Sequence, residues 1–138
     1  MSTTNQIAKY GDPEFAAITH FKVLAEDKKD YAVACAYAKV IVPGVLKNMA
    51  GALNTIAWDL VDPKNGSTTP DLDLALRAAT RAAEIRRDSD ILDTLARVCF
   101  LRGDRETALK LGKEAYAKAP TQEVKDQMLP ALKQYGLS

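Results

Sequence analysis

Residues 89 to 120, SDILDTLARVCFLRGDRETALKLGKEAYAKAP, consist of two short amphipathic segments separated by Gly103-Asp104 and followed by Pro120. Each segment repeats apolar or small residues at the spacing of one helix face: Leu92, Leu95, Ala96 and Cys99 in the first, and Ala108, Leu111 and Ala115 in the second. Glycine commonly ends a helix, aspartate caps the next one, and proline cannot continue a helix. The stretch therefore predicts a helical hairpin.

The same pattern occurs earlier in the chain. When LNTIAWDLV (53–61) is set beside LDTLARVCF (92–100), their apolar and small positions coincide: Leu53 with Leu92, Ile56 with Leu95, Ala57 with Ala96, and Leu60 with Cys99. Ala34, Ala75 and Ala108 share a small position in the second helices, where two helices of a hairpin can approach closely. Repetition of one unit predicts a stacked helical-repeat architecture rather than a single bundle.

Start and stop signals divide nearly the whole chain into helices. Asp12-Pro13 starts a first helix at about 13–26, Pro43-Gly44 ends the second, a third spans about 46–61, and Thr69 is expected to cap a fourth. The predicted fold is all-α: a right-handed α-α superhelix of about three hairpins (about 13–43, 46–87 and 89–119) and a capping helix at 121–135, kinked by Pro130. Residues 1–12 are expected to form a flexible N-terminal segment.

Residues 89–120 resemble a tetratricopeptide (TPR) repeat, with its turn at Gly103-Asp104 and its terminator at Pro120. Gly112 stands where the family usually has a large residue, and Cys99 where it has an aromatic. Across FKVLAEDKKDY (21–31), ALNTIAWDLVDP (52–63) and the segments that follow, the chain is similar to the helical-repeat module found after a thioredoxin-like domain in some exported bacterial proteins. That resemblance implies an exported or periplasmic protein, should the chain be cut from a longer precursor.

Composition excludes several classes of function. With 19 basic and 18 acidic residues, the chain has a net charge of only +1, too small to attract nucleic acid or an anionic membrane. No run of 18 apolar residues suggests a membrane span, and residues 1–15 lack the apolar core of a signal peptide, so a soluble chain is expected. Cys35 and Cys99 each lie in an apolar helical pattern, which favours buried thiols over a disulfide or a reactive cysteine.

Patterns for catalysis, metals and cofactors are missing from the sequence. One histidine, His20, cannot form a two-histidine metal site, and it is expected to be a partly exposed structural residue. Asn65-Gly66 imitates the middle of a calcium-binding loop, but the first and third ligand positions then fall on Val61 and Pro63, which offer no side-chain oxygen. No glycine-rich phosphate loop is present. The sequence thus predicts a chain that is not an enzyme and that holds no metal or cofactor.

A surface for binding a protein or peptide is the remaining prediction. In stacked hairpins the first helices line a concave face, where partners of the family usually bind. Six residues are expected on that face: Thr19, Val23, Asn54, Trp58, Asp93 and Arg97. Trp58 is either an anchor for the partner or a filler of the seam between repeats. The carboxylate-clamp type of TPR is rejected, because its positions hold Thr19, Val23, Thr55, Asp90 and Thr94.

The predicted function is a non-catalytic protein-protein interaction or scaffolding module. One alternative is an accessory or dimerisation domain of a thioredoxin-like oxidoreductase absent from this chain. Another is a small helical ligand-binding protein or enzyme with a pocket near Trp58 and Arg97. The C-terminal helix either caps the stack or forms a homodimer by docking on another protomer.

Overall fold

A computed structural model describes residues 12–62, 64 and 70–137 of the protein. This part contains α2 (Pro13–Lys22), the π-helical turn η1 (Val23–Asp27), α3 (Tyr31–Ile41), α4 (Ala50–Val61), α5 (Leu72–Ile85), α6 (Ser89–Leu101), α7 (Arg105–Lys118) and α8 (Gln122–Tyr135). No strand occurs among these residues, so the all-α class predicted from the sequence is confirmed. Residues 1–11 of the expected flexible segment, and Gly66 in the rejected calcium loop, lie outside the described residues.

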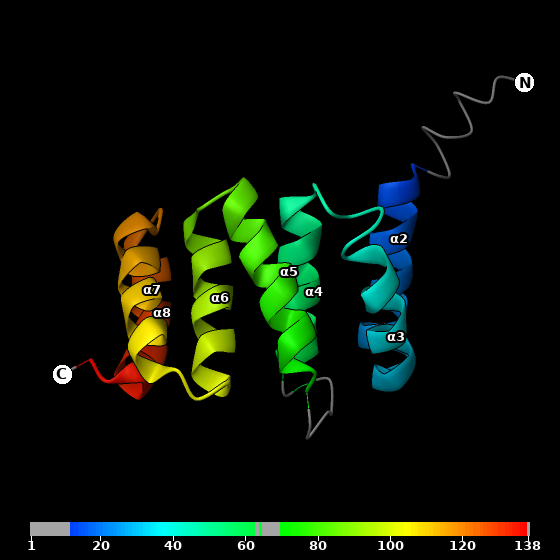
Figure 1. Cartoon of the computed structure of the whole chain (residues 1–138). Coiled ribbons are helices and arrows are strands. Elements are labelled where there is room, and N and C mark those ends of the chain that lie inside the picture. Colours follow the sequence, from blue (N-terminus) through cyan, green and yellow to red (C-terminus); the bar gives the residue numbers. More distant parts are fainter. Residues whose placement is uncertain (1–11, 63, 65–69, 138) are drawn as a thin grey trace, which may run out of the picture.

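The helices stand side by side in a row, with α2 and α3 at one end and α7 and α8 at the other (Figure 1). The most extensive packing is within the pairs α4–α5 and α6–α7, and α5 also packs along α6. α2 contacts α4, α4 contacts α6, and α6 contacts α8. This helical-repeat-like arrangement makes the alternate helices α2, α4, α6 and α8 neighbours, and their shared surface is where the candidate site lies.

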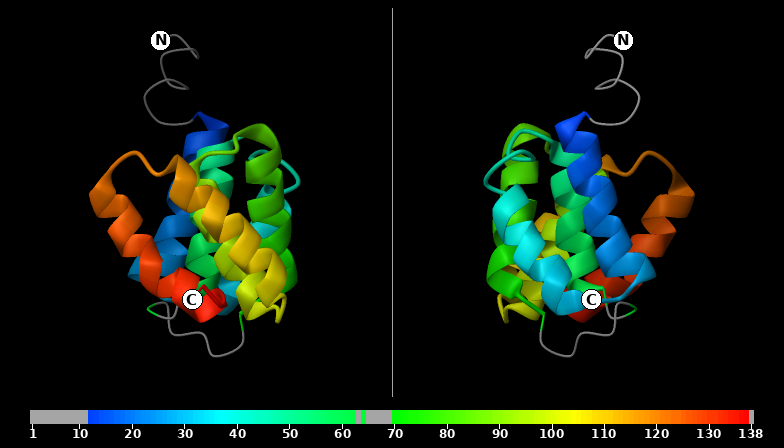
Figure 2. Two further views of the ribbon diagram at one scale, coloured as in Figure 1. Left: turned by 90° about the vertical axis from the view of Figure 1, so that its left-hand side faces the viewer. Right: turned by 90° about the vertical axis from the view of Figure 1, so that its right-hand side faces the viewer.

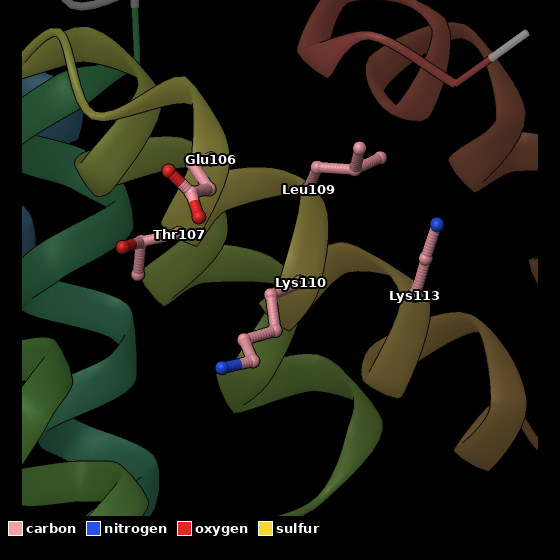
Figure 3. Close-up of a pocket in the computed structure, with 5 residues that line it drawn as sticks. All are labelled: Glu106, Thr107, Leu109, Lys110 and Lys113. Carbon is pink, nitrogen blue, oxygen red and sulfur yellow. The ribbon is translucent and has the colours of Figure 1, made fainter.

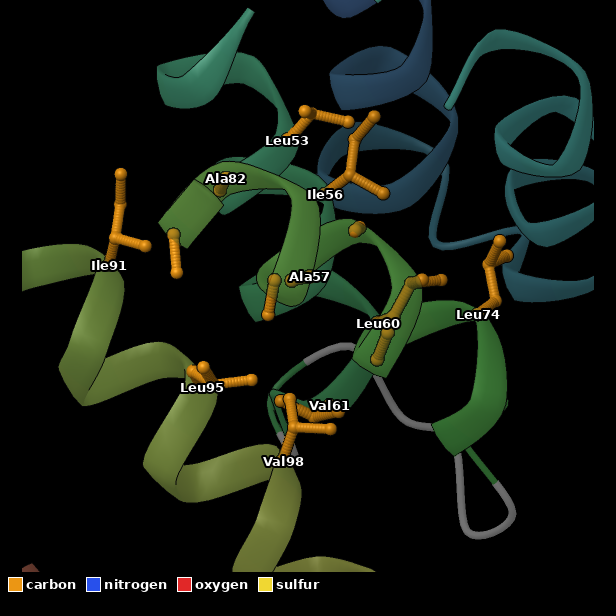
Figure 4. Close-up of a cluster of buried hydrophobic side chains, with 14 of the residues drawn as sticks. Leu53, Ile56, Ala57, Leu60, Val61, Leu74, Ala82, Ile91, Leu95 and Val98 are labelled. Atoms are coloured by element: carbon orange, nitrogen blue, oxygen red, sulfur yellow. The ribbon is translucent and has the colours of Figure 1, made fainter. Parts of the chain in front are cut away.

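The core is continuous through the stack. Between α4, α5 and α6 it consists of aliphatic side chains and alanines that are fully or almost fully buried (Figure 4): Leu53, Ile56, Ala57, Leu60, Leu74, Ala82, Ile91, Leu95 and Val98. The alanines at the shared repeat positions, Ala34, Ala75 and Ala108, are completely buried. Their small side chains allow the two helices of each hairpin to approach closely.

Side-chain caps fix where most of these helices begin. The side chains of Asp12, Asp30, Asp71, Asp88, Asp104 and Thr121 each accept a hydrogen bond from a backbone N–H in the first turn of the following helix. Among the described helices only α4 begins without such a cap, at Met49. The predicted cap at Thr69 is wrong, because Asp71 occupies that role and accepts from Leu74 N at 3.0 Å.

The first helix is shorter than the predicted 13–26. α2 ends at Lys22, and the chain continues through η1, where Lys28 N donates to Val23 O five residues earlier at 2.9 Å. A π-helical turn inserts one extra residue relative to an α-helix and rotates the side chains that follow it. Apolar periodicity does not reveal such an insertion.

The second hairpin begins at Ala50 rather than at 46. Residues 42–48 form consecutive turns, and Leu46 is completely buried beneath them. Arg81 of α5 donates to Lys47 O at 2.7 Å and to Asn48 Oδ1 at 2.8 Å. These bonds hold the connection between α3 and α4 against α5. The carbonyl of Lys47 accepts a hydrogen bond from the Arg81 side chain and does not take part in the first turn of a helix.

The last helix does not break at its proline. α8 runs from Gln122 to Tyr135 with Pro130 inside it and ends at Gly136, whose φ is 114°. Pro130 itself is exposed, while Met128, Leu132 and Tyr135 are buried against the stack. The buried side of the helix contacts α7 and α6.

Candidate functional site

A cleft of about 520 Å³ lies where α4, α6 and α8 meet. Its lining combines apolar and charged side chains from these three helices and from the chain that follows α4: Trp58, Val61, Asp62, Lys64, Pro70, Arg97, Leu101 and Gln134. Trp58 is 40% exposed and Leu101 39% exposed, so both large apolar side chains are partly open to solvent. Trp58 is also the only tryptophan of the chain.

The repeat explains why Trp58 and Arg97 meet. In the alignment of 53–61 with 92–100 they occupy the same position of successive first helices. Since α4 and α6 pack against each other, equal positions on the two helices lie on the same side of the stack. Trp58 is therefore a partly exposed member of the cleft lining.

Arg97 is held in place by α6 and α8. Its Nη1 donates to Gln134 Oε1 at 3.1 Å, and its guanidinium carbon lies 5.9 Å from the ring centre of Phe100 and 5.7 Å from that of Tyr135. Arg97 forms no ion pair with any described residue, so most of its five N–H donors stay available. The arrangement suits an acceptor group placed beside an apolar surface.

Two polar side chains lie one turn away from this pair. Asn54 and Asp93 also share a repeat position, and both are half-buried. The Asn54 Oδ1 atom is buried without a hydrogen-bond partner among the described residues. Burial raises the pKa of Asp93, and the charge of Asp90 adds to this, while Arg97 opposes it. Neither side chain lines the cleft itself.

The two candidates from the first hairpin lie elsewhere. Thr19 is exposed and lines a second cleft of about 360 Å³ between α2 and the start of α4, together with Phe15 and Met49. Val23 is half-buried in η1 and lines neither cleft. Of the six sequence candidates, the structure thus brings only Trp58 and Arg97 into one cleft.

Asp59 is a buried carboxyl group that the sequence reasoning did not single out. It is 7% exposed, and burial, followed by the hydrogen bond and charge of Glu26, raises its pKa to about 8. A signal was present, because Asp59 aligns with Val98 at a position that is otherwise apolar. Leu101, Pro70 and Gln134 were also missed, since their part in the cleft depends on how α8 and the α4–α5 connection pack.

A third hollow, of about 440 Å³, has a different character. All five lining residues, Glu106, Thr107, Leu109, Lys110 and Lys113, come from α7 (Figure 3). A ligand there would meet one helix surface, without groups converging from a second element. The cleft beside Trp58 is the stronger candidate because three helices contribute to it.

The cysteines and the histidine have structural surroundings. Cys35 and Cys99 are both free and buried, which confirms the prediction of buried thiols. Cys35 Sγ donates to Asp71 Oδ2 at 3.5 Å, and burial raises the pKa of both thiols. His20 is exposed, as expected, and its ring meets Tyr37 edge-on at 4.8 Å.

Metal-binding clusters and membrane-spanning helices are both absent from the described residues. No group of three or more His, Cys, Asp or Glu side chains there could hold a metal ion. No helix of that same part is long and apolar enough to cross a bilayer.

Comparison with protein-family models gives no match for the chain. A search among curated protein sequences likewise finds no significant relative.

Proposed function

We propose that this chain is a non-catalytic protein-interaction module of the TPR type, a right-handed superhelix that binds a peptide segment of a partner protein in the cleft beside Trp58. The observation that carries the proposal is the pairing of Trp58 with Arg97. A partly exposed indole lies in one cleft with a guanidinium that is positioned by Gln134 and two rings and that forms no ion pair with the residues the structure describes.

Each group has a definite part in binding. Trp58 and Leu101 receive an apolar side chain, because rigid aromatic surface buries area at low cost in conformational entropy. Arg97 donates to a carboxylate or a backbone carbonyl of the same peptide, since a guanidinium offers planar, paired donors. The partner is therefore a peptide with an apolar residue close to an acceptor.

Peptide selection tests this proposal. A random peptide display library is panned on the immobilised chain, and binding of the recovered peptides is measured by the fluorescence of Trp58 and, for Trp58 variants, by the anisotropy of labelled peptides. Trp58→Ala and Arg97→Gln should each raise the dissociation constant at least about tenfold, roughly 1.4 kcal/mol, as expected for anchor residues.

Matched controls are available on α5. Ile85 is 40% exposed, as open as Trp58, and Arg77 is exposed and lies outside the cleft. Ile85→Ala and Arg77→Gln should leave the dissociation constant unchanged. Failure to recover any peptide, or equal binding by the Trp58 and Arg97 variants, would refute the proposal.

A further inference from the structure

The cleft of about 360 Å³ beside Phe15, called the Phe15 cleft below, borders the same stripe of α4 as the Trp58 cleft. Thr55 lines the Phe15 cleft and Trp58 lines the other, and side chains three residues apart are neighbours on one helix face. Gly51 and Asp62 continue this stripe toward the two ends of α4 and line the Phe15 cleft and the Trp58 cleft respectively. The two clefts are therefore adjacent.

The clefts open on opposite flanks of this stripe. The Phe15 cleft is shared with α2 and the Trp58 cleft with α6 and α8, and α4 contacts both α2 and α6. In the right panel of Figure 2, α2 (blue) lies beside α3 (cyan), on the side toward α8 (orange to red). A ligand that crosses α4 on this side can enter both clefts.

The Phe15 cleft offers an apolar surface of its own. Phe15 and Ile18 of α2 line it together with Met49 and Ala52 at the start of α4. Phe15 is 65% exposed, and Met49 is also exposed. A phenyl ring beside a flexible thioether can receive an apolar side chain of varied shape. The cleft is thus suited to a second apolar residue of the ligand that binds beside Trp58.

The two clefts carry opposite net charge. Each is lined by three charged side chains: Asp12, Glu14 and Lys22 in the Phe15 cleft, and Asp62, Lys64 and Arg97 in the Trp58 cleft. The first set has one negative charge in excess and the second has one positive charge in excess. Glu14 is half-buried and, like Arg97, forms no ion pair with any described residue. A ligand that is acidic at one end and basic at the other complements both clefts.

The separation of the clefts sets the length of the ligand. Along α4 the two lining segments are centred about seven residues apart, which corresponds to roughly 10 Å at the rise of an α-helix. Across α4 the separation is about one interhelical distance, again about 10 Å. The diagonal of about 14 Å is spanned by about four residues of an extended peptide.

We propose that the Phe15 and Trp58 clefts form one groove, which binds a single extended peptide with two apolar residues about four positions apart. An acidic residue of the peptide lies beside the first apolar residue, at Trp58 and Arg97, and a basic residue lies beside the second, at Phe15 and Glu14. This inference rests on the proposed function and adds a second subsite to it. Thr19, an exposed residue of the Phe15 cleft, then borders the same ligand as Trp58.

Peptides selected on the immobilised chain test the groove, with binding followed by the anisotropy of labelled peptides. Phe15→Ala should raise the dissociation constant of the whole peptide at least about fivefold, because an apolar anchor loses its contact. A peptide cut back to the residues beside Trp58 should bind wild type and Phe15→Ala equally and still respond to Trp58→Ala. Val40→Ala is the matched control, since Val40 is 69% exposed, as open as Phe15, and lines neither cleft.

The charge of the second subsite is tested by a double-mutant cycle. Replacing the basic residue of the peptide by glutamine should weaken binding to the wild type about threefold, as expected for a partly exposed ion pair, and should have no effect on Glu14→Gln. Glu123→Gln, at an exposed carboxylate that lines neither cleft, should keep the wild-type response. Circular dichroism should show the same helix content for every variant.

The outcomes separate this proposal from the one on which it rests. If Trp58→Ala weakens binding but Phe15→Ala does not, the single groove is overturned and the Trp58 cleft remains a peptide site. If Trp58→Ala has no effect, both proposals are refuted. A Glu14→Gln chain that still distinguishes the basic peptide from its glutamine form would also overturn the second subsite.

Discussion

Asp59 makes the stability of this protein depend on pH in an unusual direction. A carboxyl group whose pKa is raised to about 8 by burial and by Glu26 binds its proton more tightly in the folded chain than in the unfolded one. Its contribution is fully present below a pH of about 4 and is lost as the pH rises through about 8. Asp59→Asn removes this titration and keeps a side chain of the same size.

The expected result for Asp59→Asn is a free energy of unfolding nearly equal to the wild type's at pH 4 and higher than it at pH 9, by on the order of 5 kcal/mol for a shift of about four pKa units. Urea denaturation at a series of pH values measures it. Glu106→Gln serves as the control at an exposed carboxylate of α7 that does not contribute to the pKa of Asp59. Parallel pH profiles for the wild type and Asp59→Asn would contradict the argument.

The contribution of Glu114 to the stability of the protein depends on pH in the opposite direction. Arg87 donates to both of its oxygens at 2.7 Å and Lys118 Nζ lies 3.0 Å from Oε2, and these partners lower its pKa to about 2. Its stabilisation is present above the unfolded pKa and is lost as the pH falls toward 2. Because the cluster is solvent-exposed, Glu114→Gln should cost no more than about 1 kcal/mol at pH 7, measured by urea denaturation. Glu123→Gln, outside any ion pair among the described residues, should have no effect.

At the scale of helices, Gly112 is what allows α8 to cap α7. A Cβ atom at position 112 would lie 2.7 Å from Leu132 Cδ2 and 3.3 Å from Tyr135 Cδ2, two side chains that are themselves buried. This gives a physical reason for the glycine where a large residue was expected by resemblance. The space that a large side chain at position 112 would fill is occupied by the Leu132 and Tyr135 side chains of α8.

Gly112→Leu should therefore separate α8 from α7 and lower the free energy of unfolding by about 1–3 kcal/mol, the usual cost of overpacking. Gly51→Ala is the control, because a Cβ there meets only Arg86 Nη2, at 3.9 Å. That change should be neutral or slightly stabilising, since alanine is the better helix former. Thermal melts followed by circular dichroism distinguish the two, and a Gly112→Leu chain as stable as the wild type would contradict the role of Gly112.

The match between apolar positions of successive repeats made some of the helices and part of the candidate site predictable from the sequence. Matching Leu53 with Leu92 locates α4 and α6 and, by the same offset, aligns Trp58 with Arg97. The register could not reveal η1, because the buried residues Phe21, Leu24 and Ala25 are also spaced as on an uninterrupted α-helix. It could not reveal the turns at 42–48 either, since these depend on Arg81. It also could not separate Thr19 from Trp58, since their assignment to different clefts depends on how the helices pack.

For the whole molecule, packing density predicts where the chain opens first. The contacts of α4–α5, α5–α6 and α6–α7 are extensive, whereas α2, η1 and α3 touch α4 only sparingly. In a linear stack the stability of a unit is the sum of its own stability and that of its neighbouring interface. The α2–α3 hairpin has one weak interface, so it should unfold locally while the remaining helices stay folded.

Hydrogen exchange measures this difference residue by residue. In dilute solution, amides in the middle of α2 and α3 should exchange at least about tenfold faster than those in α4 to α7, a gap of about 1.4 kcal/mol in opening free energy. Uniform exchange along the stack, or faster exchange in α6 and α7 than in α2 and α3, would show that interface size does not set the order of opening.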